Sequence, residues 1–321
     1  MSRVYDALQK SQGENPSASP LVTGQPEAPP AETATTVSGD EFAAGVPAAP
    51  VTIPSAVSAE PPRVVTTDGK WLQVPADRVL HPHPTPEQRL VSIAEPDSAG
   101  AEMFRVLSTR LAHMQRKRTL HKLLITSSEG DEGKSVLAVN LAFALSHRHN
   151  QRTLLIEADL RRPTASSLLS SSSLPGITEW SEGKLALEDS LYRVNDLPFW
   201  FLSAGRGMEE PMPLLESDRF ARMLETVSSS FDWVLLDATP MLPMADSTSL
   251  SRLCDGVLVV VREGHTRRRV LNKALESIEK SKLLGTILNE ASMLQVGYDR
   301  YYSSKNGKTK KEADKAKAIT A

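Results

Sequence analysis

Short apolar runs alternate with amphipathic stretches along most of residues 98–289. Apolar runs of strand length predict β-strands, and apolar residues at helical spacing predict α-helices between them. Strands that alternate with helices form a mostly parallel sheet with helices on both faces, so the pattern predicts an α/β fold. The expected strands are 121–127, 153–158, 199–203, 232–237, 256–261 and 284–289, and the expected helices are 98–114, 134–147, 217–229 and 267–281.

The segments on either side of this region have no such alternation. Of the 22 prolines, 15 precede residue 98, and residues 13–64 are rich in Pro, Ala, Ser, Thr and Glu. A chain of this composition cannot bury enough apolar surface to offset its ordering entropy. We therefore expect a disordered linker at 13–95, a folded domain at 96–296, and a flexible, lysine-rich tail at 297–321.

Composition narrows the classes of function. The chain has 321 residues and a formal net charge of −2, which gives no general attraction to nucleic acid. The single cysteine, Cys254, excludes an internal disulfide, and its place beside an apolar strand favours a buried structural thiol over a nucleophile. No apolar run approaches the ~20 residues that span a bilayer, so we expect a cytoplasmic protein. In residues 1–12, Val4 and Leu8 lie four positions apart, a spacing that places them on one face of a helix. The segment is either a frayed terminus or a short docking helix, and it does not have the pattern of an export signal.

A glycine-containing loop joins the strand at 121–127 to the next helix. It ends in Gly133, Lys134 and Ser135, and the order of strand, loop and helix is what a phosphate-binding loop requires. Backbone N–H groups at the helix start would face the phosphates, Lys134 would reach the β- and γ-phosphates, and the Ser135 hydroxyl would hold Mg²⁺. The strict pattern G-x-x-x-x-G-K-[ST] fails at its first glycine, where this chain has Ser128.

Acidic residues follow two of the buried strands. Glu157 and Asp159 end the strand at 153–158, and Asp237 ends the strand at 232–237 in the manner of a Walker B element. Ligands of an open parallel sheet lie beyond the carboxyl ends of the strands, where carboxylates are suitable ligands for Mg²⁺. Each acid alone is more often a solvated strand end or a helix cap. Their order after a phosphate loop favours a nucleotide site.

These elements resemble the bacterial tyrosine kinases of capsule and exopolysaccharide export, the CpsD/CapB type, within the MinD/ParA group of P-loop ATPases. Residues 126–135 follow the family's T-S-x-x-P-G-E-G-K-S closely, and residues 157–163 follow its D-A-D-x-R-[RK]-P. Residues 284–289 match its L-G-x-V-L-N. The resemblance covers residues 95–302 and implies a P-loop NTPase fold.

The resemblance implies an ATP- and Mg²⁺-dependent protein-tyrosine autokinase that regulates exopolysaccharide or capsule synthesis and export. It implies metal ligands at Ser135, Asp159 and Asp237. It implies catalytic roles for Lys134, Glu157, Asp159 and Asp237, with Glu157 orienting or deprotonating the acceptor. The nucleotide-binding residues that it implies are Gly130, Asp131, Glu132, Gly133, Lys134, Ser135, Val136 and, at the base, Asn289.

Three of the five tyrosines lie close together near the C-terminal end: Tyr298, Tyr301 and Tyr302. In the family such a cluster is the autophosphorylation substrate, and a flexible tail suits a group that must reach another active site. The alternative is that the three rings cap the last strand. The family also implies a membrane chain-length-determinant partner, a cognate tyrosine phosphatase, a location at the inner face of the plasma membrane, and a homo-oligomer formed through Glu102 and Arg105.

Four departures from the family pattern bear on activity. Glu157 replaces an aspartate and is one methylene longer, in a site where geometry matters on the ångström scale. Asp131 replaces a glycine, which restricts φ and brings a negative charge near the phosphates. Ser108 replaces the second arginine of the oligomerisation motif E-x-x-R-x-x-R. Ala238 replaces a threonine after the Walker B acid, which is a milder change.

Two other functions stay open at this point. One is a MinD/ParA-like ATPase switch that phosphorylates no tyrosine. Glu129 disfavours it, because partition ATPases have a signature lysine there that acts on a phosphate across the dimer, and an acid cannot do so. The other is a nucleotide-binding scaffold with degenerate kinase activity, which Asp131, Glu157 and Ser108 would explain.

Overall fold

The computed structural model of this chain describes residues 64–65, 71–72, 78–149, 151–170, 173–242 and 244–291. Their main feature is an eight-stranded sheet with the order β10–β9–β4–β8–β5–β7–β6–β3. Neighbouring strands pair in parallel except β6 and β7, which are antiparallel. The strands are β3 (Val79–Leu80), β4 (Lys122–Ser127), β5 (Thr153–Glu157), β6 (Leu191–Val194), β7 (Phe199–Leu202), β8 (Trp233–Asp237), β9 (Gly256–Arg262) and β10 (Leu283–Asn289), and a separate hairpin pairs β1 (Val64–Val65) with β2 (Trp71–Leu72).

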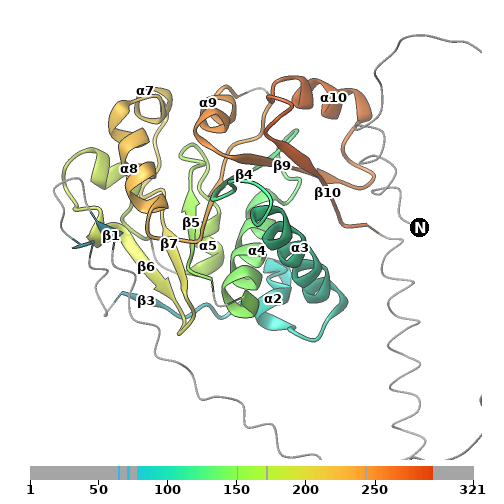
Figure 1. Cartoon of the computed structure of the whole chain (residues 1–321), viewed down its shortest axis with the longest axis horizontal. Coiled ribbons are helices and arrows are strands. Elements are labelled where there is room, and N and C mark those ends of the chain that lie inside the picture. Colours follow the sequence, from blue (N-terminus) through green and yellow to red (C-terminus); the bar gives the residue numbers. More distant parts are fainter. Residues whose placement is uncertain are drawn as a thin grey trace, which may run out of the picture. The chain divides into compact units, whose positions relative to one another are not determined.

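Helices cover both faces of the sheet (Figure 1). Successive residues of a strand point to opposite faces, so Leu123 and Ile125 belong to one core cluster and Leu124 to the other. The cluster of Leu123 includes residues of α3, α4 and α5, and that of Leu124 includes residues of α6, α7, α8, α9 and α10. The helices are α2 (Val91–Ala94), α3 (Ala99–Gln115), α4 (Lys134–His149), α5 (Ala165–Leu169), α6 (Ile177–Ser181), α7 (Met212–Leu215), α8 (Asp218–Ser228), α9 (Asp246–Leu253) and α10 (Arg268–Glu276), with short 3₁₀ turns at Pro86–Gln88 and Glu188–Ser190.

The predicted α/β fold is confirmed. All six expected strands are present, and each begins and ends within one residue of its expected bounds. The expected helix at 267–281 is shorter, because α10 ends at Glu276. Ile278 N–H then bonds to the carbonyl of Leu275, a three-residue spacing that tightens the chain into a turn.

The described fold also extends further toward the N terminus than the expected boundary at residue 96. Strand β3 pairs with β6, where Asn195 N–H donates to the carbonyl of Leu80 at 2.8 Å. Leu80 and Leu90 are buried in the core cluster of Leu123. A two-residue strand within a proline-rich segment has no periodic pattern, so only its tertiary contacts reveal it.

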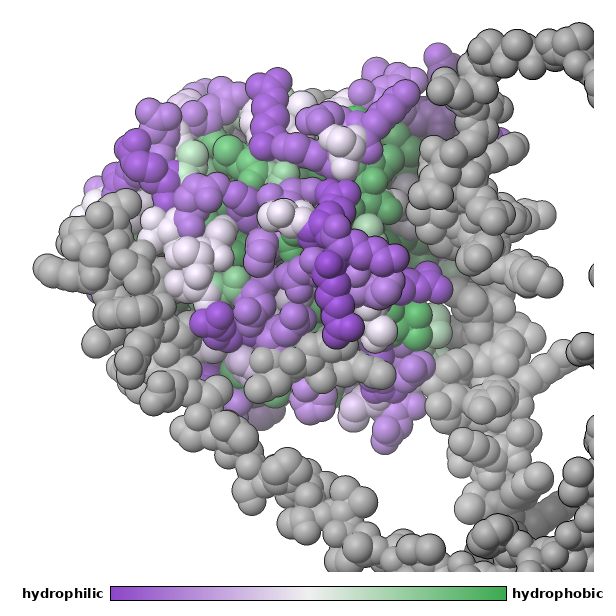
Figure 2. All heavy atoms as spheres, viewed as in Figure 1, coloured by the Kyte–Doolittle hydropathy of each residue, from purple (hydrophilic) through white to green (hydrophobic). Residues whose placement is uncertain are grey.

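Hydrophilic residues cover most of the described surface in the view of Figure 2. The large apolar side chains exposed among the described residues are Met103, Val106 and Leu288. Cys254 is buried, and burial raises the pKa of its thiol to about 12, which agrees with a structural role. No helix in the described ranges is both long and apolar enough to cross a membrane.

Candidate functional site: a phosphate loop with buried carboxylates

The predicted phosphate loop lies between the end of β4 and the start of α4. Leu137 N–H donates to the carbonyl of Gly133 at 2.9 Å, so helical hydrogen bonding begins within the loop's last residues. The loop passes through left-handed backbone conformations, with φ of 60° at Asp131 and 89° at Gly133. Asp131 therefore adopts a backbone conformation that a glycine would adopt at less cost.

The ends of β5 and β8 bring the predicted acids to this loop. The N–H groups of Ala158 and Asp159 both donate to the carbonyl of Asp237, at 2.8 and 2.9 Å. The Lys134 ammonium lies 2.9 Å from Oδ2 of Asp159 and 3.8 Å from Oδ1 of Asp237. The parallel sheet thus joins three residues that lie far apart in the sequence.

Burial sets the charges of this cluster. Burial raises the pKa of Asp237 to about 6, although the positive charge of Lys134 opposes the rise. Burial also acts to lower the pKa of Lys134, but the carboxylates of Asp237 and Asp159 outweigh it, so this pKa is raised. Lys134 is therefore a firmly protonated cation beside two buried acids.

Asp237 is the acid whose coordination is incomplete. Its side chain is fully buried, and neither carboxylate oxygen accepts a hydrogen bond from the part of the chain that the structure describes. Although Lys134 lies 3.8 Å away, a buried carboxylate without hydrogen-bond donors is costly, so such a group is suited to a cation or to water. Together with the Ser135 hydroxyl and Asp159, it forms the set of hard oxygen donors that Mg²⁺ prefers.

These donors do not form a complete metal site. Among the described residues no group of three or more His, Cys, Asp or Glu side chains could hold a metal ion. Mg²⁺ commonly takes only one or two carboxylates and completes its coordination with phosphate oxygens and water. The residues around Asp237 therefore fit a metal that arrives with a nucleotide.

Thr164 is a neighbour of the loop that sequence reasoning missed. The Ser135 hydroxyl donates to Oγ1 of Thr164 at 3.4 Å, and Lys134 donates to the Ser135 hydroxyl at 3.3 Å. Thr164 follows the sequence Arg161-Arg162-Pro163 and precedes α5. A hydroxyl immediately after the second acidic motif is the signal that could have identified it.

Glu157 ends β5, as predicted, but its carboxylate is hydrogen-bonded to Ser166 and Ala204 rather than to Lys134. Its carboxylate is fully buried and accepts hydrogen bonds on both oxygens, from Ser166 N–H at 3.0 Å and from Ala204 N–H at 3.1 Å. The Ser166 hydroxyl donates to the oxygen that also accepts from Ala204. Glu157 therefore joins β5 to α5 and to the end of β7.

Arg161 and Asp246 form a second contact across the carboxyl edge of the sheet. Arg161 Nε donates to Oδ2 of the buried Asp246 at 2.7 Å, which ties the segment after Asp159 to the start of α9. The hydrogen bond that Arg161 donates to Asp246, and the negative charge of Asp246, raise the pKa of the Arg161 guanidinium. This pair could not be predicted, because α9 itself was not among the expected helices.

The other residues expected to bind the nucleotide are Gly130, Glu132, Val136 and Asn289. A methyl group at Gly130 would meet no atom within 4 Å, and Val136 lies in the first turn of α4. Glu132 is fully buried and its carboxylate accepts the N–H of Ser128 at 2.7 Å, while the partly buried Asn289 donates through Nδ2 to the carbonyl of Glu132 at 3.0 Å. These two expected nucleotide contacts are therefore hydrogen-bonded to the protein itself.

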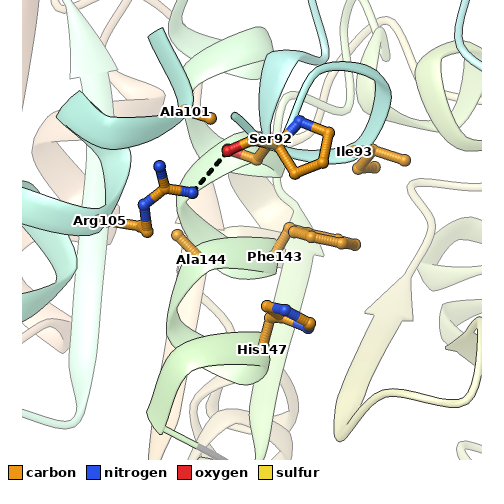
Figure 3. A pocket seen from close by; sticks show the side chains of 8 residues that line it. Ser92, Ile93, Ala101, Arg105, Phe143, Ala144 and His147 are labelled. Atoms are coloured by element: carbon orange, nitrogen blue, oxygen red, sulfur yellow. Dashed lines mark hydrogen bonds between the residues drawn. The ribbon is translucent and has the colours of Figure 1, made fainter. Parts of the chain in front are cut away.

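The expected oligomerisation residues lie on α3, at a distance from the loop. Arg105 Nε donates to Oε2 of Glu102 at 2.6 Å within the same helix, and Nη1 donates to the carbonyl of Pro96 at 2.6 Å. A groove of about 240 Å³ lies beside Arg105, and Figure 3 shows Phe143 and His147 on α4 across from it. Ser108 is fully buried, so an arginine there would not reach solvent without a change in packing.

The predicted phosphoacceptors, Tyr298, Tyr301 and Tyr302, lie outside the described residues.

Comparisons with known proteins agree with this geometry. Residues 123–295 match the family described as CobQ/CobB/MinD/ParA nucleotide binding domain. The chain is 30% identical over 194 residues to the tyrosine-protein kinase CpsD of Streptococcus agalactiae serotype Ia, across 60% of this chain and 82% of that protein. It is 32% identical over 219 residues to the succinoglycan biosynthesis transport protein ExoP of Rhizobium meliloti, across 66% of this chain and 28% of that one.

A solved structure gives the same result for the fold. The kinase domain of the Escherichia coli tyrosine kinase ETK superposes with a TM-score of 0.58 at 26% identity, over 63% of this chain and 82% of that one.

Proposed function

Because this chain belongs to the CobQ/CobB/MinD/ParA nucleotide-binding family, in the group of bacterial tyrosine-protein kinases, we propose that it is an ATP-dependent protein-tyrosine autokinase. We propose that it regulates exopolysaccharide or capsule synthesis and export. One observation supports this most: Lys134, Asp159 and Asp237 converge beside the phosphate loop, and the Asp237 oxygens there have no hydrogen-bond donor among the described residues.

The proposed site binds Mg·ATP through the loop and the two acids. The loop N–H groups and Lys134 would stabilise charge on the transferred phosphoryl group. Ser135, Asp159 and Asp237 would hold Mg²⁺, which when bound neutralises charge on the phosphates. Since Lys134 contacts both acids before nucleotide arrives, its ammonium would exchange part of this contact for phosphate oxygens.

Transfer would break the bond between the γ-phosphorus and its bridging oxygen and form a bond to a tyrosine oxygen. The tyrosine hydroxyl loses its proton in this exchange, and Glu157 is the proposed acceptor of that proton or its orienting group. The Ser166 hydroxyl and the N–H of Ala204 donate to the same Glu157 oxygen, so this role requires that the Ser166 hydroxyl rotate away. The proposed phosphoacceptors are Tyr298, Tyr301 and Tyr302, in a lysine-rich segment where each phosphate would add nearly two negative charges.

The proposed partner is a membrane chain-length-determinant protein, which would hold this chain at the inner face of the plasma membrane. The name of ExoP, a succinoglycan biosynthesis transport protein, supports a role in polysaccharide transport. A cognate tyrosine phosphatase would reverse the modification, and copies of this chain would assemble through the α3 surface with Glu102 and Arg105.

The test is phosphotyrosine formation on the purified full chain with Mg·ATP, read by mass spectrometry. We expect label on the C-terminal tyrosines, and loss of it in Lys134→Ala. Changing Tyr298, Tyr301 and Tyr302 together to phenylalanine should also remove the label; persistent labelling would reassign the acceptor. ATP hydrolysis without any phosphotyrosine, even with the partner's cytoplasmic segment added, would favour a MinD/ParA-like switch instead.

A further inference from the structure

Glu132 is the one carboxylate inside the phosphate loop that is fully buried. Its Oε2 accepts hydrogen bonds from the backbone N–H groups of Ser128, at 2.7 Å, and Glu129, at 3.1 Å. Those N–H groups lie at the beginning of the loop, so the side chain closes the loop on itself. The carboxylate is therefore bonded within the protein and not exposed to solvent.

The other oxygen of Glu132 reaches a distant part of the chain. Its Oε1 accepts the hydroxyl of Thr266, which lies in the turn between β9 and α10, 134 residues further on. The Thr266 hydroxyl oxygen in turn accepts the N–H of Arg262 at 2.8 Å. The hydroxyl thus uses both of its roles, donor and acceptor, to fix the turn against the loop.

The end of β10 holds the same loop from a third direction. Asn289 Nδ2 donates to the Glu132 carbonyl at 3.0 Å, and its Oδ1 accepts the N–H of Glu290 at 3.0 Å. A Cβ atom on Gly133 would lie 2.3 Å from Asn289 Nδ2. Its positive φ of 89° favours glycine at position 133, and a Cβ there would also force the Asn289 side chain to move.

We propose that Glu132, Thr266 and Asn289 are positioning residues for the nucleotide: they hold the phosphate loop in its binding conformation before ATP arrives. The proposal rests on the proposed function, because the ligand is the ATP of that site. A loop fixed in advance loses less conformational entropy on binding, so its affinity is higher. The loop geometry is then set from β9 and β10, not only from β4 and α4.

The first test measures ATP affinity of the full chain by calorimetry in the presence of Mg²⁺. Thr266→Val keeps the shape of the side chain but leaves Glu132 Oε1 without its donor, and we expect affinity to fall about tenfold. Thr266→Ser restores the hydroxyl and should bind within about twofold of the wild type. Thr226→Val is the matched control, because the hydrogen bond that the Thr226 hydroxyl makes is local, to the carbonyl of Arg222 one turn earlier in α8.

The second measurement separates positioning from a general loss of stability. Amide hydrogen exchange without nucleotide should be faster at Ser128 and Glu129 in Thr266→Val, while the urea midpoint stays close to that of Thr226→Val. Unchanged exchange together with unchanged ATP affinity would overturn the proposal. If the wild type itself binds no ATP, the proposed function fails, and exchange at Ser128 and Glu129 still tests whether Thr266 holds the loop.

Discussion

Replacing Asp237 with asparagine should stabilise this protein while removing its metal-dependent nucleotide binding. The free structure buries the Asp237 carboxylate without a hydrogen-bond donor among the described residues. Its pKa rises from the ordinary 3.8 to about 6, even with Lys134 nearby. Since each pKa unit between the folded and unfolded states is worth about 1.4 kcal/mol, the ionised side chain costs about 3 kcal/mol of folding stability at neutral pH.

The effect of the Asp237 carboxylate on stability depends on pH, because only the ionised form is destabilising. A carboxyl with a raised pKa binds its proton more tightly when folded, so its destabilising effect is absent below about pH 4 and grows as pH rises through 6. Wild type and Asp237→Asn should therefore have similar unfolding free energies at pH 4. At pH 8 the variant should be more stable by about 1–3 kcal/mol, the lower figure applying if the new amide lacks partners.

The assay is urea unfolding followed by tryptophan fluorescence, because Trp200 and Trp233 are fully buried. Asp196→Asn is the matched control, since it makes the same chemical change at an exposed side chain. Calorimetry with Mg·ATP should show no binding by Asp237→Asn. A variant that is less stable than wild type at pH 8, or a difference independent of pH, would refute the reasoning about burial.

Three further substitutions test the phosphate loop, the bonds of Glu157, and the backbone packing at Gly176, the residue that precedes α6. Asp131→Asn should tighten ATP binding about threefold, because it removes a charge near the phosphates and tolerates the positive φ; unchanged affinity in calorimetry would contradict this. Glu157→Asp should lower the unfolding free energy by about 1–3 kcal/mol, because the shorter side chain cannot keep its bonds to Ser166 and Ala204; wild-type stability in urea would exclude it. Gly176→Ala should cost at least about 2 kcal/mol, since its Cβ would lie 2.0 Å from the Ser203 carbonyl oxygen; an unshifted urea midpoint would be the contrary result.

Much of the fold could be predicted because its strands and main helices carry strong local patterns. Five of the six predicted strands are runs of mostly buried apolar residues, β10 at the sheet edge is only partly buried, and the positions of all six follow from the sequence alone. The short elements β3, β6 and α9 were not predicted. They have few residues or little periodicity, and pairing and packing with distant segments decide them.

Some parts of the candidate site could likewise be predicted from the sequence, and others could not. Lys134, Asp159 and Asp237 could be predicted to meet, because a phosphate loop and the carboxyl ends of parallel strands share one edge of a sheet. The direction of individual side chains could not. The sequence places Glu132 and Glu157 among functional residues, but only the structure shows that both carboxylates are buried and bonded within the protein.

By itself, then, the sequence determined the α/β order of elements, the phosphate loop and the acids that follow the strands, because these depend on residue types at short spacing. The tertiary structure decided which atoms meet: Thr266 with Glu132 across 134 residues, and Asn289 with the same loop across 157. Hydrogen bonds of this kind depend on ångström-scale distances between segments that no local pattern relates. For that reason the loop could be found in the sequence, whereas the groups that hold it in shape could not.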